Sequence, residues 1–85
     1  MISREQLKMA RSALGWSVRD LSERTGLGTA TISRFENGAD AYSETLRKIE
    51  AVFEAEGIRF GKNDDGGLWV CLTPGFAASR QQDQG

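Results

Sequence analysis

The sequence contains no histidine and only one cysteine, Cys71, and these two shortages narrow its possible chemistry. Histidine is the commonest general base and the commonest nitrogen ligand for metal ions. A lone thiol can form neither an internal disulfide nor a metal site, so Cys71 is expected to be structural. Asp64 and Asp65 stand in a predicted loop without an opposing set of ligands, which is typical of solvated turn residues. We therefore predict a protein that is not an enzyme and that needs no metal or cofactor.

Long apolar runs are also missing from the sequence. No stretch approaches the ~20 uninterrupted apolar residues that a membrane-spanning helix needs, and no segment resembles a secretory signal. We expect a soluble cytoplasmic protein with a single compact domain that buries roughly 60% of its unfolded surface.

A strong net charge is lacking as well, since 11 basic residues are balanced by 12 acidic residues, for a formal net charge of -1. The overall charge therefore gives no sign of a nucleic-acid partner. The distribution is uneven, because residues 1–38 carry six basic and four acidic side chains and the remainder carries five and eight. This weak asymmetry fits a DNA-reading front half followed by an element for assembly.

Four segments of the sequence open with a helix-start signal and close on a glycine, which predicts four helices in the first 57 residues. The first two begin with capping boxes, in which Ser3 and Ser17 each pair with the polar residue three positions later. The third helix starts at Gly28, a weaker N-cap, and the fourth opens at Ser43. The glycines that end the four helices are, in order, Gly15, Gly26, Gly38 and Gly57.

After the fourth helix the apolar period changes from helical to two, which predicts a β-hairpin over residues 58–74. Leu68, Val70 and Leu72 form one face of its second strand, which can cover the fourth helix. Residues 75–85 have little apolar content and are predicted to form a disordered tail.

The opposite face of the second strand carries Trp69 and Cys71, which would leave a large aromatic side chain exposed on a monomer. An isolated two-stranded hairpin is marginally stable in water. We therefore predict a homodimer interface that includes Trp69, Cys71 and Phe60. The alternative is that Trp69 folds over its own hairpin.

The most specific feature is the middle pair of helices, which are joined by the short turn at residues 26–28. Two short helices joined by a glycine turn cross steeply and project the second helix outward, where it fits the major groove of DNA. Ile32 and Phe35 have the spacing of residues that face the core. The side chains left to contact bases are Thr29, Ala30, Ser33 and Arg34. The same spacing also fits an ordinary solvated helix face.

The segments Leu14 to Ser17 (LGWS) and Ile32 to Gly38 (ISRFENG) resemble the Cro and phage-repressor-like (XRE-type) helix-turn-helix family, and the likeness covers residues 3–55. The resemblance implies that the third helix is the recognition helix. It also implies a structural ion pair between Arg11 and Glu36. The residues expected against the DNA backbone are Ser17, Val18, Arg19, Gly28, Thr31 and Asn37.

Two positions depart from the family pattern. Asp40 stands in the loop after Gly38, where relatives often carry a basic residue, so electrostatic affinity for DNA should be lower. Gly28 replaces the usual polar N-cap of the recognition helix, which costs only about a few tenths of a kcal/mol but removes a hydroxyl group.

These observations predict a mainly α fold, in which a four-helix repressor-like helix-turn-helix domain (residues 1–57) precedes a β-hairpin for dimerisation (58–74) and the disordered tail. The expected function is transcriptional repression by a homodimer on an inverted-repeat operator in double-stranded DNA. Repression is favoured because the chain has no room for a separate effector-binding or activation domain. The alternative is an antitoxin-like protein that binds a toxin-like partner and regulates its own gene through the helix-turn-helix.

Overall fold

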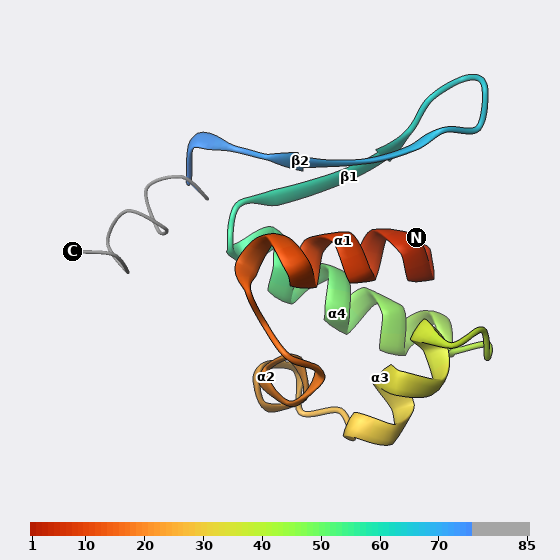
Figure 1. Cartoon of the computed structure of the whole chain (residues 1–85), viewed down its shortest axis with the longest axis vertical. Coiled ribbons are helices and arrows are strands. Elements are labelled where there is room, and N and C mark those ends of the chain that lie inside the picture. The colour runs from red at the N-terminus through yellow and green to blue at the C-terminus, as the bar shows by residue number, and fades with distance from the viewer. Residues whose placement is uncertain (76–85) are drawn as a thin grey trace.

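The computed structural model describes residues 1–75 and confirms the predicted, mainly helical fold (Figure 1). Residues 76–85 of the predicted tail lie outside the described residues. Within the described part of the chain, no helix has the length and apolar character to cross a bilayer. The elements are α1 (Arg4–Leu14), α2 (Val18–Thr25), α3 (Thr29–Glu36), α4 (Ser43–Ala55), β1 (Ile58–Lys62) and β2 (Leu68–Leu72), and the two strands form an antiparallel hairpin.

Both capping boxes form, and they set where α1 and α2 begin. The Ser3 hydroxyl accepts the Gln6 N–H at 3.1 Å, and the Gln6 side chain accepts the Ser3 N–H at 3.0 Å. Ser17 and Asp20 make the same pair of bonds at 3.1 and 2.9 Å. The hydrogen bond from the Ser17 backbone N–H lowers the pKa of Asp20, because it stabilises the charged carboxylate.

The core is organised around Phe53 of α4, which is fully buried. Trp16 stacks on Phe53 with 5.8 Å between ring centroids, and Phe60 of β1 meets it edge-on at 5.9 Å. The Arg24 guanidinium lies 4.2 Å from the centroid of the Trp16 ring. These contacts join α2, α4 and β1. The other buried apolar residues are Ile2, Leu7, Ala10, Leu14, Leu21, Ile32, Phe35, Leu46, Ile49 and Ile58.

The hairpin lies across α1 and α4, at the opposite end of the molecule from α2 and α3 (Figure 1). β2 packs mainly on α1, not on the fourth helix as predicted, and β1 packs on α4. The buried Gln6 side chain of α1 accounts for this placement, because its Nε2 donates to the carbonyls of Gly61 (2.9 Å) and Trp69 (3.0 Å). One amide group therefore ties α1 to both strands.

The outer face of the hairpin carries Trp69, whose indole lies across its cross-strand partner Gly61. A Cβ on Gly61 would lie 1.8 Å from Cζ2 of Trp69, so the indole occupies the space that a side chain would need. Trp69 thus folds over its own hairpin, as in the alternative arrangement, and is still 39% exposed. Phe60, which was also predicted for the dimer interface, is turned inward onto Phe53 by strand alternation, away from Trp69 and Cys71.

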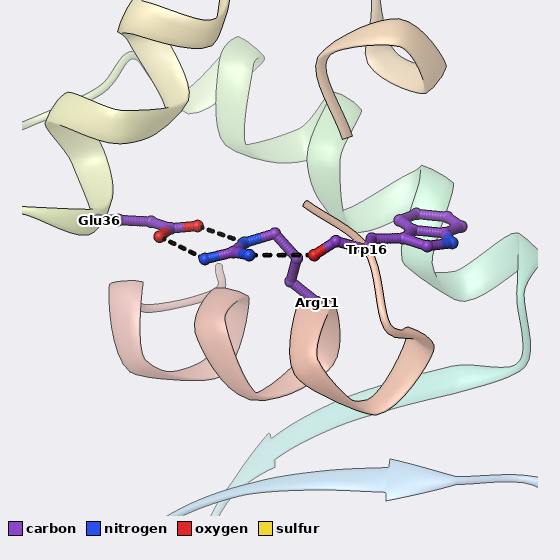
Figure 2. A network of polar contacts seen from close by, with 3 residues as sticks. All are labelled: Arg11, Trp16 and Glu36. Carbon is purple, nitrogen blue, oxygen red and sulfur yellow. Dashed lines mark hydrogen bonds and ion pairs between the residues drawn. The ribbon is translucent and has the colours of Figure 1, made fainter. Parts of the chain in front are cut away.

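Arg11 of α1 and Glu36 at the end of α3 form a bidentate ion pair (Figure 2). Nε and Nη2 of Arg11 each donate to one carboxylate oxygen at 2.9 Å, and Nη1 donates to the Trp16 carbonyl at 3.0 Å. The hydrogen bond to Glu36 raises the pKa of Arg11. The Glu36 side chain is only 8% exposed, so this pair fixes the end of α3 against α1.

Replacing Glu36 with glutamine should lower the free energy of unfolding by about 3 kcal/mol, because it leaves a mostly buried guanidinium without its counter-charge. Urea unfolding followed by circular dichroism measures the change. Glu56→Gln is the matched control, because the Arg24–Glu56 pair is more exposed and 4.0 Å apart. Its loss should cost about 0.5 kcal/mol or less. Equal effects of the two substitutions would contradict the structural role assigned to Glu36.

Candidate nucleic-acid interface

The C-terminal end of α3 is held by a second arginine of α1. Nε of Arg4 donates to the Phe35 carbonyl at 3.3 Å, and Nη2 donates to the Gly38 carbonyl at 3.1 Å. A cation is favourable there, because the carbonyl end of a helix carries partial negative charge. No local sequence pattern marks Arg4, because its partners lie 31 and 34 residues away. Together with the Glu36 ion pair, this contact fixes α3 at one end.

The turn between α2 and α3 is held by side chains of α2. The Ser22 hydroxyl donates to the Leu27 carbonyl. The Thr25 hydroxyl accepts the Leu27 N–H at 3.2 Å and donates to the Leu21 carbonyl at 2.8 Å. Gly26 has a φ of +77°, in the left-handed region that glycine adopts without strain. In Figure 1, α2 is seen end-on while α3 runs obliquely across the view, which is the steep crossing predicted for this turn.

One face of α3 is buried and the other is open. Ile32 is fully buried and Phe35 is 7% exposed, so both face the core as predicted. Three of the four residues predicted to contact bases, Thr29, Ala30 and Arg34, are exposed, and Ser33 is half-buried. The side chain of Arg34 makes no hydrogen bond or ion pair with any of residues 1–75. Its guanidinium is therefore free to bind a ligand.

The residues predicted to meet the DNA backbone gather near this open face, at the N-terminal ends of α2 and α3 and at the C-terminal end of α3. The Ser17 hydroxyl accepts the Asp20 N–H, which leaves its own proton free to donate. Gly28 caps α3 without a side-chain hydrogen bond, so the first amides of α3 are open to an anion. Val18 is half-buried, and the exposed members of the set are Ser17, Arg19, Gly28, Thr31 and Asn37.

A hollow of about 330 Å³ lies beside this face, between α3 and the loop that leads to α4. Thr31 and Arg34 line it from α3, and Asp40 and Tyr42 line it from the loop. Tyr42 is 85% exposed and is the N-cap of α4, so the helix begins at Ser43 rather than being capped by it. Tyr42 was not predicted as a site residue, although an aromatic side chain in the loop after the third helix was an available signal.

The comparisons with known proteins agree with this geometry. A sequence profile of the Helix-turn-helix family matches residues 7–56, which include α2, the turn, α3 and α4. A protein of Archaeoglobus fulgidus, named as a candidate HTH-type transcriptional regulatory protein, is 33% identical over 55 residues. The aligned segment covers 65% of this chain and 18% of the relative, so the chain spans less than a fifth of that relative's length. Because the profile matches more than half of the chain, the chain belongs to the helix-turn-helix family, as its resemblance to Cro and the phage repressors indicated.

Proposed function

We propose that the protein is a sequence-specific transcriptional regulator that binds double-stranded DNA, and that it represses as a homodimer on an inverted-repeat operator. The observation that carries this proposal is the open face of α3, where the guanidinium of Arg34 has no partner within residues 1–75. The opposite face of the same helix is buried at Ile32 and Phe35. A helix that is anchored along one side and open along the other can enter the major groove.

The open side chains of α3 have the chemistry to distinguish base pairs. The guanidinium of Arg34 can donate two parallel hydrogen bonds to O6 and N7 of a guanine. Ala30 lies one helical turn before Arg34 and can contact a thymine methyl group. Thr29 and Ser33 can donate to or accept from base edges or phosphates.

Contacts to phosphates would set the position of α3 without reading the sequence. Arg19 supplies a cation, Ser17 supplies a hydroxyl donor, and the amides that follow Gly28 supply the positive end of the α3 dipole. The exposed phenol of Tyr42 adds a further donor beside α3. The remaining proposed backbone contacts are Val18, Thr31 and Asn37.

Selection from random double-stranded DNA by the purified protein, followed by titration of the selected sites at two salt concentrations, tests the proposal. The expected result is an enriched inverted repeat with half-site centres about 34 Å apart, bound more weakly as salt rises. A lack of enrichment would contradict sequence-specific DNA binding and favour a function in binding another protein.

Replacing Arg34 with alanine should cost about 1–3 kcal/mol per half-site and relax the preference for one base pair in each half-site. Competition binding against a library of variant sites measures both effects. Arg19→Ala is the matched control, because loss of a phosphate contact should weaken binding to all sequences about equally and reduce the salt dependence. If Arg34→Ala also weakened every site equally, Arg34 would contact a phosphate and not a base.

Replacing Asp40 with asparagine should raise the affinity for DNA by a few-fold at low salt, because it removes a carboxylate from the hollow beside Arg34. The gain should shrink as salt rises, while base preference stays unchanged. Asp65→Asn is the control, since Asp65 lies in the hairpin loop, far from α3 (Figure 1). An equal gain from both substitutions would show that only the net charge matters.

A further inference from the structure

The two edges of the hairpin can be told apart by where their backbone groups point. The Thr73 N–H donates to the Gly57 carbonyl (2.9 Å) at one end of the ladder, and the Asn63 N–H donates to the Gly67 carbonyl (2.7 Å) at the other. Bonded and non-bonded pairs alternate along an antiparallel ladder, so the odd-numbered residues bond across the hairpin in the observed register. The even-numbered residues therefore direct their N–H and C=O groups outward, to the two edges.

The edge of β1 is covered by a charged side chain. Nη1 of Arg59 donates to the outward carbonyl of Ile58 at 2.9 Å and to the Glu54 carbonyl of α4 at 3.1 Å. Lys62 places a second cation at the end of the same strand. Cations on an edge strand discourage the addition of another strand. The edge of β1 is thus protected.

The edge of β2 has no such cover. In this ladder the N–H and C=O groups of Leu68, Val70 and Leu72 point away from β1, and they make no backbone hydrogen bond outside the hairpin within residues 1–75. The strand contains no charge and no proline, and Leu68 and Leu72 are 40% and 48% exposed. Gln6 holds the strand in place through the Trp69 carbonyl. A fixed apolar edge with unpaired amides is a template for a further strand.

We propose that β2 pairs with β2 of a second copy of this chain, so that two hairpins form one four-stranded antiparallel sheet. The inference rests on the proposed homodimer and names its interface. If the two β2 strands pair along their whole length about a two-fold axis, Val70 lies opposite Val70 of the partner subunit. Leu68 then lies opposite the partner's Leu72, and Trp69 lies opposite the partner's Cys71. In this register the even-numbered residues bond across the interface, where their free groups already point.

The strand suits its own copy because a two-fold contact brings similar positions together. Like charges that face one another across a strand pair are destabilising, and β2 has no charged residue. When two copies pair antiparallel strands within one sheet, the two-fold axis that relates them is perpendicular to the sheet. The helices of both copies therefore lie on the same side of that sheet. In Figure 1 the hairpin lies at one end and α3 at the other. Both copies of α3 would therefore face the same side, as two half-sites on one duplex require.

Hydrogen exchange of the wild-type protein, measured by NMR at a high and a low concentration, tests this interface without mutation. The amides of Leu68, Val70 and Leu72 should exchange about tenfold more slowly where sedimentation shows dimer than where it shows monomer. The amides of Trp69 and Cys71 bond within the hairpin and should be protected at both concentrations. A dimer without added protection at the three edge amides would overturn the inference and leave the proposed regulator standing.

Two double variants test the register. Leu68→Glu with Leu72→Glu opposes like charges across the interface, whereas Leu68→Glu with Leu72→Lys opposes unlike charges with the same number of substitutions. The dimer dissociation constant should be about tenfold higher for the first variant, by sedimentation, with circular dichroism to show that both fold. Equal dimer dissociation constants for the two double variants would overturn the proposed register.

A wild-type protein that stays monomeric at every concentration, yet binds its selected DNA site, would overturn both the interface and the homodimer. It would leave the proposed DNA binding intact. If either variant failed to fold, the exchange measurement on the wild type would still decide the question.

Discussion

The position of α3 depends on the ion pair between Arg11 and Glu36. A helix of eight residues is too short to be stable by itself in water, so its position is set by its contacts with the rest of the chain. Burial of Ile32 and Phe35 supplies the apolar contacts. Burial alone, however, allows a short helix to slide or rotate. The bidentate geometry of Arg11 on Glu36 restricts both movements, and a buried ion pair contributes to geometry more dependably than to net stability.

Helix α1 contacts α3 at one end of the molecule and the hairpin at the other. On one side it carries Arg11 and Arg4, which hold α3, and on the other it carries Gln6, which holds both strands of the hairpin. Gln6 also closes the capping box at Ser3, so the start of α1 and the place of the hairpin are set by one side chain. The direction of α3 relative to the hairpin is thereby fixed through one rigid element. For a regulator that dimerises through the hairpin, that direction sets the spacing of the half-sites it can bind.

The sequence predicted the features that arise from local signals and missed those that depend on distant contacts. Capping boxes and the period of apolar residues act over a few positions, which is why the helix order and the open face of α3 were predictable. Gln6 bonds to residues 55 and 63 positions away, and no local pattern marks it. The inward packing of Phe60 depends on Phe53, which only the folded chain brings near. The position of Trp69 follows from the strand register, which pairs it with a glycine that has no side chain to displace the indole.

The acidic side chains beside the exposed arginines of the proposed DNA-binding face give dimerisation its importance for the proposed function. Proteins gain non-specific affinity for DNA by neutralising phosphates and releasing counterions. Here Arg19 and Arg34 are exposed at the proposed interface, but the exposed carboxylates of Asp20 and Asp40 oppose them. In the proposed complex, one copy would therefore gain little electrostatic affinity for any DNA sequence. If two copies are linked through a rigid sheet, the second half-site contact becomes intramolecular, which would raise affinity only where both half-sites are present. In such a dimer, discrimination between DNA sites would depend on the spacing and direction of the two α3 helices as much as on the base contacts of each helix.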